Sequence, residues 1–254
     1  MNSVEVRFHG AAGTVAGSCF EFRGGEKTVL VDCGLFQGTR TLEALNHERL
    51  PFDPVAIDAV ILTHAHLDHS GRLPYLVASG CAAPIWATEP TVDIIGPPLL
   101  DAAKLQAGDA ERRNRRPDRA GMSAFEPLYT ADDVTACLGY LREARYCDWH
   151  DLGNGDGFRL WDARHIVGSA SVELMLGGQR ILVSGDIGGG SAIACAAAEL
   201  VGYDHVLCEA TYGNREREPV LFSDRREELA RHVEEVLERG GNLLEEDDAG
   251  YSDR

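Results

Sequence analysis

The chain has 254 residues, 44% of them apolar, and carries 24 Lys and Arg against 41 Asp and Glu, a formal net charge of −17. This composition is that of a globular protein able to bury a sizeable core, and no apolar run is long enough to span a membrane. The negative charge argues against unassisted binding of nucleic acid, so a polyanionic partner needs a local attractive feature.

The N-terminal segment "MNSVEVRFHG" alternates like a β-strand and lacks the charged-then-apolar form of a signal peptide. The seven cysteines form no C-x-x-C pair and are odd in number, which favours reduced thiols over a disulfide framework. We therefore expect a cytoplasmic protein without a membrane anchor. The basic stretch "ERRNRRPDR", residues 111–119, is interpreted as a solvated helix end and a Pro-broken loop, with local attraction of a polyanion as the alternative.

Several short apolar runs predict β-strands. The first alternates with period two, as a half-buried strand does, whereas "DAVIL" and "RILVS" are typical of strands buried on both faces. In chain order the predicted strands are "VEVRF" (4–8), "CFEF" (19–22), "TVLVD" (28–32), "DAVILTH" (58–64), "PIWAT" (84–88), "FRLWDA" (158–163), "SVELML" (171–176), "RILVSGD" (180–186) and "HVLCEA" (205–210).

Helices are predicted between and after these strands. Residues 70–80, "SGRLPYLVASG", have helical character, and Thr130 begins a second helix with Asp133 three positions on. Its apolar face holds Val134, Cys137, Leu138 and Leu141. A third helix is expected from about Ser223 to Arg239, burying Leu229, Val233, Val236 and Leu237 and ending at Gly240-Gly241. Strands early and late with helices between them predict an α/β fold of two sheets sandwiched between helices.

Five of these predicted strands, all interpreted as buried, have an ionisable residue at or just after the carboxyl end. They are Asp32, His64, His165, Asp186 and Glu209. Loops at that edge of a sheet gather functional groups. One such residue would carry little weight, but five predict a site.

The densest of these segments is "LTHAHLDHSG", residues 62–71. Residues two apart in an extended segment point the same way, so His64 and His66 can bind one ion together. Imidazole suits zinc at neutral pH, and a nearby carboxylate adds charge. Asp68 and His69 are expected on the turn before the following helix. The alternative, a helix-capping turn that is rich in His by chance, fits this spacing poorly.

"THAHLDHSG" resembles the second motif of the metallo-β-lactamase superfamily, and other motifs follow in the family order: Asp32 in "VDCGLFQG", His165 in "ARHIVGSAS" and Asp186 in "SGDIG". "HIVGSA" and "CEATYGNR" resemble the β-CASP branch, whose members cleave RNA or DNA. Within that branch the chain is most similar to bacterial and archaeal relatives of the endonuclease that trims messenger-RNA 3′ ends. The implied fold is the αββα sandwich of the superfamily, incomplete at the C-terminus.

The resemblance also implies roles for individual residues. His64, His66 and His165 would hold a first zinc ion, Asp68 and His69 a second, and Asp186 would bridge both. Asp32 would orient the histidine loop without binding metal. Two such ions can share a hydroxide and stabilise charge on a scissile phosphate, with Asp68 orienting that hydroxide. Glu209 would be the acid specific to the branch, where it pairs with a histidine from a later domain; a turn-capping carboxylate is the alternative.

The resemblance breaks near the end of the chain. After "ERGGNLL" the family continues with an apolar strand, whereas this chain reads "EEDDAGYSDR", which is typical of a disordered tail. We expect a metallo-β-lactamase-like domain over residues 1–210, the start of a truncated β-CASP domain over 211–244, and an acidic tail over 245–254. The second zinc site would then be incomplete.

The predicted function is that of a zinc-dependent RNA-processing nuclease that cleaves phosphodiester bonds by a metal-bound hydroxide, weakly or not at all in this chain. Its substrate would be RNA, with single-stranded DNA as the alternative. Two other interpretations stay open: a hydrolase of a small ester or thiolester, and a non-catalytic zinc-binding remnant. The first does not account for "CEATYG", and the second does not account for the intact ligand set.

Overall fold

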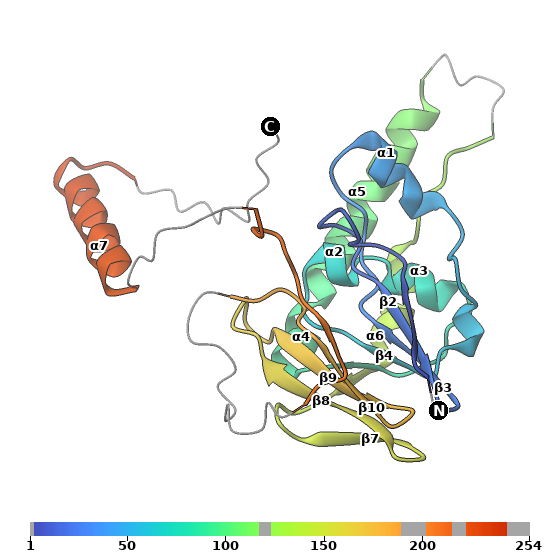
Figure 1. The fold of residues 1–254 in the computed structure, drawn as a ribbon. Coiled ribbons are helices and arrows are strands. Elements are labelled where there is room, and N and C mark those ends of the chain that lie inside the picture. The colour runs from blue at the N-terminus through green and yellow to red at the C-terminus, as the bar shows by residue number, and fades with distance from the viewer. Residues whose placement is uncertain (1–2, 117–122, 189–201, 215–221, 243–254) are drawn as a thin grey trace. The chain divides into compact units, whose positions relative to one another are not determined.

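The computed structural model describes residues 3–116, 123–188, 202–214 and 222–242 (Figure 1). They belong to two compact units, Met1–Thr211 and Tyr212–Arg254. The expected acidic tail, residues 245–254, lies outside the described residues.

Two β-sheets form the first unit. The six-stranded sheet has the order β1-β2-β3-β4-β5-β6. Its first three strands are antiparallel and the rest parallel, so that Phe22 pairs with Val29 and Val31 with Ile61. The strands are β1 (Glu5–Phe8), β2 (Phe20–Gly24), β3 (Lys27–Val31), β4 (Ala59–Ile61), β5 (Ile85–Ala87) and β6 (Leu141–Glu143).

The second sheet has five strands in the order β11-β10-β9-β8-β7. All neighbours are antiparallel except β10 and β11, which run parallel. The strands are β7 (Trp149–Gly153), β8 (Asp156–Asp162), β9 (Ala170–Leu176), β10 (Gln179–Val183) and β11 (His205–Leu207). The nine strands expected from the sequence are all present in the two sheets.

Six α-helices accompany these sheets in the described part of the first unit. Thr39, Thr88 and Thr130 begin three of them by accepting a hydrogen bond from a backbone N–H of the first turn. At Thr130 the predicted capping box with Asp133 is present. The helices are α1 (Arg40–Ala44), α2 (Leu67–Ser70), α3 (Leu73–Ala78), α4 (Glu89–Ile94), α5 (Gly96–Asn114) and α6 (Ala131–Leu138), with short 3-10 turns at Leu45–His47 and Pro54–Ala56.

The central strands β3 and β4 of the six-stranded sheet are buried on both faces. Val29, Val31 and Ile61 pack on one face against the second sheet, in a cluster with Phe158, Leu160, Val172 and Leu174. Leu30, Val60 and Leu62 pack on the other face, in a cluster with Leu73, Leu76, Leu99 and Val134 from helices α3, α5 and α6. This alternation explains the apolar runs of β3 and β4. The two-sheet, mixed α/β architecture that the sequence predicts is confirmed.

Some local predictions are wrong. Helix α6 ends at Leu138 because Gly139 follows, and Leu141, expected on its apolar face, lies in β6. Strands β6 and β7 were not predicted, since "LRE" and "WHDLG" are too short or too polar to show a strand period. Strand β11 was expected to be buried, but it is an edge strand and the side chain of Val206 is 58% exposed.

The second unit contains helix α7, Phe222–Glu238, close to the predicted span. Gly240 adopts a left-handed φ of 65°, and the N–H of Gly241 donates to the carbonyl of Val236, so the predicted glycine ending is correct. The predicted burial is wrong: Leu229 is 51% and Leu237 70% exposed. Within this unit's described residues no second helix or strand covers the apolar face.

Five cysteines are free thiols, as expected: Cys19, Cys33, Cys81, Cys137 and Cys208. Cys147 is disulfide-bonded, so the expectation of reduced thiols is wrong at that position. Among the described residues, no helix has both the length and the apolar character needed to cross a membrane.

Candidate metal centre

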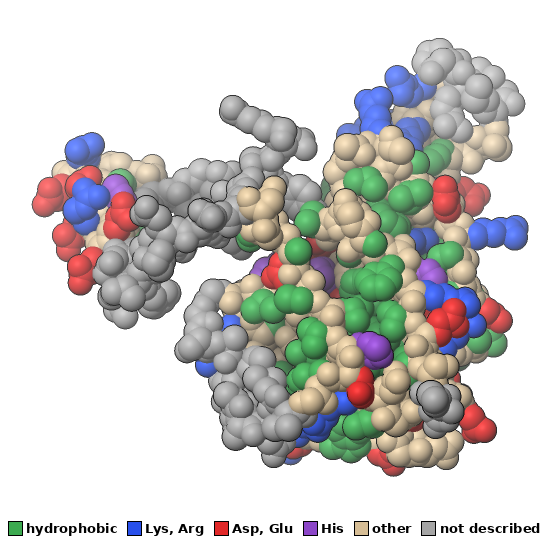
Figure 2. Space-filling model, in the orientation of Figure 1, with side chains coloured by type: hydrophobic (Ala, Val, Ile, Leu, Met, Phe, Trp, Pro, Cys, Tyr) green, Lys and Arg blue, Asp and Glu red, His purple; other side chains and the backbone are tan. Residues whose placement is uncertain are grey.

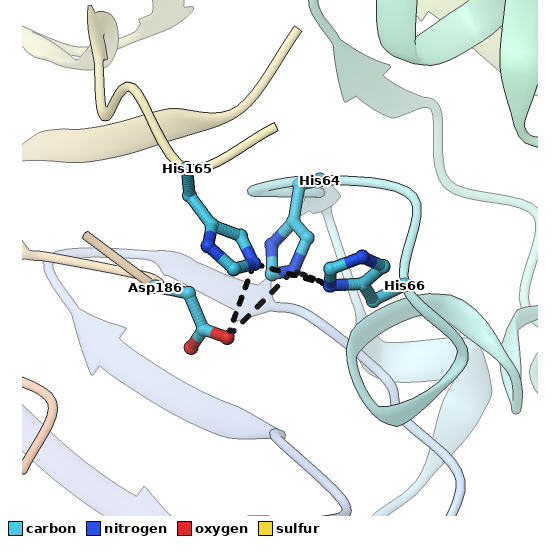
Figure 3. Close-up of side chains that lie close together, drawn as sticks. All are labelled: His64, His66, His165 and Asp186. Carbon is cyan, nitrogen blue, oxygen red and sulfur yellow. Dashed lines mark hydrogen bonds and ion pairs between the residues drawn. The ribbon is translucent and has the colours of Figure 1, made fainter. Parts of the chain in front are cut away.

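The structure describes all five ionisable residues that were predicted at strand ends, and four donor side chains of the candidate metal site lie after strands or at the start of a helix. His64 follows β4 after two buried residues and is fully buried. His66 stands at the N-terminus of α2. His165 comes three residues after β8, and Asp186 three residues after β10. Figure 3 shows these four side chains turned toward one another, although His165 and Asp186 are far along the chain from His64 and His66.

The four residues form the group that could hold a metal ion. Nε2 of His64 lies 3.0 Å from Nδ1 of His66, which is 3.2 Å from Nε2 of His165. Oδ2 of Asp186 is 3.6 Å from the His165 nitrogen and 3.9 Å from that of His64. One donor atom from each of the four lies within 4.8 Å of the other three. Ligands about 2.0–2.1 Å from a tetrahedral zinc ion are about 3.3–3.4 Å apart, so three imidazoles and a carboxylate fit such an ion.

Proton affinities of the histidines agree with that fit. Burial, followed by the nearby imidazoles of His69, His66 and His165, lowers the pKa of His64 well below its usual value. Burial and His165 also lower the pKa of His66. Both rings are therefore neutral near pH 7, and a neutral imidazole is the form that binds a metal ion.

A second set of donors adjoins the first. Nε2 of His69 lies 3.3 Å from Oδ1 of Asp186 and 3.9 Å from Oδ2 of Asp68. The two carboxylate oxygens of Asp186 therefore face two different donor sets. Asp68 and His69 were expected on a turn, but they belong to the four-residue helix α2, which begins at Leu67.

Charges in the second set are strongly coupled. Burial alone would lower the pKa of His69, but the carboxylates of Asp32 and Asp186 outweigh it and raise that pKa to about 10. Burial raises the pKa of Asp68. Burial would also raise the pKa of Asp186, yet its interactions with His69 and the other histidines lower it. The proton on His69 therefore compensates a cluster of carboxylates that a divalent ion could also compensate.

Asp32 connects both donor sets. Its Oδ1 accepts a hydrogen bond of 2.8 Å from the N–H of Thr63, and its Oδ2 accepts hydrogen bonds of 3.0 Å from the hydroxyls of Ser18 and Thr63. The same Oδ2 lies 2.7 Å from Nδ1 of His69. Since the Thr63 hydroxyl donates to Asp32, it accepts from Nδ1 of His64 at 3.0 Å. Both rings thereby keep their Nε2 atoms directed into the site.

The loop that carries His165 is held by contacts that sequence reasoning missed. The Ser169 hydroxyl accepts from the N–H groups of His165 and Ile166 at 2.9 and 3.2 Å. The hydroxyls of Thr88 and Thr91 donate to the carbonyl of Gly168 at 2.6 and 2.9 Å. The T-x-x-T spacing in "ATEPT" at a predicted strand end was the available signal, but nothing local indicates that it binds a loop almost eighty residues later.

Glu209 lies beside the Asp186 segment. Its Oε1 accepts from the N–H of Ile187 at 2.8 Å and its Oε2 from the N–H of Thr211 at 3.2 Å. Its own N–H donates to the Ser184 hydroxyl at 2.9 Å. Glu209 therefore contacts a residue on each side of Asp186: its backbone N–H contacts Ser184 and its carboxylate contacts Ile187.

Comparisons with known proteins agree with this arrangement. The sequence profile described as "Metallo-beta-lactamase superfamily" matches residues 12–220. The chain is 37% identical to Ribonuclease TTHA0252 of Thermus thermophilus over 92% of this chain and 49% of that protein. It is 28% identical to transcription termination factor FttA of Methanocaldococcus jannaschii (95% and 36% of the two chains) and to endoribonuclease YSH1 of Eremothecium gossypii (96% and 31%). The chain thus spans about half the length of the first relative and about a third of the other two.

Proposed function

Because the chain belongs to the metallo-β-lactamase superfamily, we propose that it is a metal-dependent hydrolase of RNA phosphodiester bonds with zinc as its metal. The observation that carries the proposal is the shared carboxylate of Asp186. Its Oδ2 lies 3.6 and 3.9 Å from the Nε2 atoms of His165 and His64, while its Oδ1 lies 3.3 Å from Nε2 of His69. Such sharing suits two neighbouring cations, the arrangement typical of hydrolases that act on phosphodiesters.

RNA is the proposed substrate class because of the relatives. The resemblance to β-CASP ribonucleases that "HIVGSA" and "CEATYGNR" predict is confirmed by matches to proteins named ribonuclease and endoribonuclease. Single-stranded DNA has the same backbone chemistry and is the alternative substrate. We also propose that residues 1–210 form the hydrolase domain, and that the protein works in the cytoplasm.

The superfamily implies a divalent metal, and zinc is the ion that the donor set favours, since three imidazoles and one carboxylate are common zinc ligands. His64, His66, His165 and Asp186 would hold the first ion, and Asp68, His69 and Asp186 the second. Bound there, the ions would supply Lewis-acid activation of water and charge neutralisation at a phosphate.

The chain's own side chains divide the remaining tasks. Asp68 is half-buried next to the second donor set, where its carboxylate can accept a hydrogen bond from an attacking water and orient it. Asp32 and Thr63 fix the imidazoles from behind. Both Glu209 oxygens accept from backbone N–H groups, which supports a positioning role beside Asp186. Its role as an acid for the leaving group stays a prediction.

The proposal is tested by loading the chain with zinc and following three substrates: single-stranded RNA, bis(p-nitrophenyl) phosphate and a p-nitrophenyl thiolester. We expect slow hydrolysis of both phosphodiesters, in line with the weak activity predicted from the sequence, and a further reduction of about 100-fold or more by Asp186→Asn because that change weakens both donor sets. The matched control is Asp58→Asn, which changes a carboxylate that accepts from the Thr28 N–H far from the site.

Two results would contradict the proposal. Hydrolysis of the thiolester but of neither phosphodiester would support the small-ester interpretation instead. Zinc binding without turnover of any of the three substrates would support the non-catalytic interpretation.

A further inference from the structure

A basic surface lies at the C-terminal end of α5, away from the metal ligands in the chain. Asp109, Arg112, Arg113 and Arg116 line one pocket there. Asp109, Arg112 and Arg113 lie at the end of α5, and Arg116 follows two residues after its last residue. Figure 2 shows blue side chains gathered at this end of the molecule. Residues 109–116 contain four arginines and two acidic residues, an excess of positive charge in a chain whose net charge is −17.

A helix end alone would account for part of this pattern, since arginines in the last turn stabilise the helix dipole. Arg112 pairs with Asp109, and Arg115 pairs with Glu111 at 3.1 Å. These pairs use two of the four arginines within the helix. Arg113 differs because its guanidinium contacts the ring of Phe125, which belongs to another segment.

Three segments meet around Arg113. The guanidinium carbon of Arg113 lies 4.4 Å from the ring centroid of Phe125, and the imidazole of His47 lies 4.9 Å from the same ring at a steep angle. Asn114 holds this arrangement: its Nδ2 donates to the Phe125 carbonyl at 2.9 Å, and its Oδ1 accepts from the Phe125 N–H at 2.8 Å. Phe125 is only half-buried and His47 is exposed. A fixed cation and an aromatic ring are thus both presented at the surface.

We propose that Arg112, Arg113 and Arg116, with Phe125, form a binding surface for single-stranded RNA. The inference rests on the proposed function, which names RNA as the substrate. Guanidinium groups bind phosphate oxygens through several N–H donors. A base can stack on the Phe125–Arg113 pair, as bases stack on aromatic and guanidinium groups in proteins that hold single strands. The surface supplies the local attraction that a strongly acidic protein needs to hold a polyanion.

The test is fluorescence anisotropy of a labelled, pyrimidine-rich RNA strand titrated with the zinc-loaded chain, and a denaturing gel run after each titration checks that the strand is still uncleaved. The double variant Arg112→Gln/Arg116→Gln is compared with Arg231→Gln/Arg239→Gln, which removes the same charge from exposed positions of α7 and the residue after it. Each lost phosphate contact lowers the salt slope by about 0.7 for a single strand. The wild-type affinity should therefore fall about sevenfold more than that of the first variant between about 50 and about 200 mM salt.

A third variant separates stacking from charge. Phe125→Leu should weaken binding by about fivefold or more at each salt concentration while leaving the salt slope unchanged, since stacking is not a counterion effect. If both double variants bind RNA with the same affinity and the same salt slope, the surface is not an RNA site.

Failure of this inference and failure of the proposed function give different results. None of these substitutions touches a proposed metal ligand, so zinc content and hydrolysis of bis(p-nitrophenyl) phosphate should match the wild type. Arginine-dependent RNA binding without any phosphodiester hydrolysis would contradict the proposed function and leave the surface standing. Phosphodiester hydrolysis together with RNA binding that does not depend on these arginines would contradict the RNA-binding surface and leave the proposed function standing.

Discussion

Asp32 is the residue on which most of the site's internal order depends. It is fully buried and has a left-handed φ of 61°, a conformation that an Asp adopts more readily than most residues. The described partners of its carboxylate all present donors to it: the Ser18 hydroxyl, the hydroxyl and N–H of Thr63, and the imidazole of His69. A buried carboxylate surrounded only by donors is a strong acceptor that fixes ring orientation.

Replacing this carboxylate by an amide should disturb the metal site without removing a ligand. In Asp32→Asn, an NH₂ group replaces one carboxylate oxygen, so the donors that faced that oxygen lose their acceptor. We expect a loss of about 10- to 100-fold in zinc affinity, as is usual for partners behind metal ligands. The measurement is a competition titration with a zinc chelator. Asp58→Asn is the control, and equal affinities of the two variants would contradict the orienting role.

At the scale of elements, the loop between β8 and β9 decides where His165 lies. Thr88 and Thr91, at the start of α4, hold this loop through the Gly168 carbonyl. Gly168 has a φ of 84°, and a Cβ there would approach the Thr91 hydroxyl and N–H at 2.6 and 2.7 Å. Both the backbone conformation and the space therefore require glycine.

Gly168→Ala should displace the loop and weaken the first metal site. Gly178→Ala is a matched control, because Gly178 has a φ of 78° but a Cβ added there would meet no atom within 4 Å. Left-handed strain of about 1 kcal/mol or more is common to both variants. Only Gly168→Ala should also lower zinc affinity and add a further loss of melting temperature. Comparable zinc affinity in both variants would show that the Thr88–Thr91 contact does not position His165.

At the scale of the whole molecule, the metal centre joins parts of the chain that are far apart. Its candidate ligands follow β4, lie in α2, and follow β8 and β10, so they come from both sheets and from the first helix after β4. Asp32, Asp68 and Asp186 converge on His69. Without a cation, these carboxylates are balanced mainly by that one imidazole.

Removing zinc should therefore lower the melting temperature of the chain. An ion that binds only the folded state adds about 2.7 kcal/mol when its free concentration is 100 times its Kd. The measurement is a thermal melt with excess zinc and with a chelator. His64→Ala/His66→Ala serves as the control and should melt at the same temperature in both conditions. Identical curves for the wild-type chain would rule out a stabilising ion.

The two donor sets of the molecule differ in how many zinc ligands they offer, which determines how much zinc the chain keeps after dialysis. The first donor set has three imidazoles and a carboxylate, whereas the second has one imidazole, Asp68 and the shared Asp186 within the described residues. We expect closer to one ion than two per chain by elemental analysis. Two tightly held ions would require a ligand that neither donor set contains.

Much of this protein could be predicted from its sequence, because strand periods and local spacing are local properties of a chain. The apolar runs predicted nine of the strands. The H-x-H-x-D-H spacing predicted a metal site, since residues two apart in an extended segment share a direction. The superfamily and its β-CASP branch were also recognisable from short motifs. Where local signals were weak, as in β6 and β7, or where burial depended on neighbours, as for Leu229, the predictions failed.

The tertiary structure alone decided which distant residues meet. Thr88 contacts a carbonyl 80 positions away, and Asp32 lies against His69 across 37 positions. The Arg113–Phe125–His47 contact joins three separate segments in the same way. Such contacts follow from how two sheets and their helices pack, which no local spacing encodes. The division of Asp186 between two donor sets has the same origin, because it depends on placing the ends of β4, β8 and β10 within a few ångströms of each other.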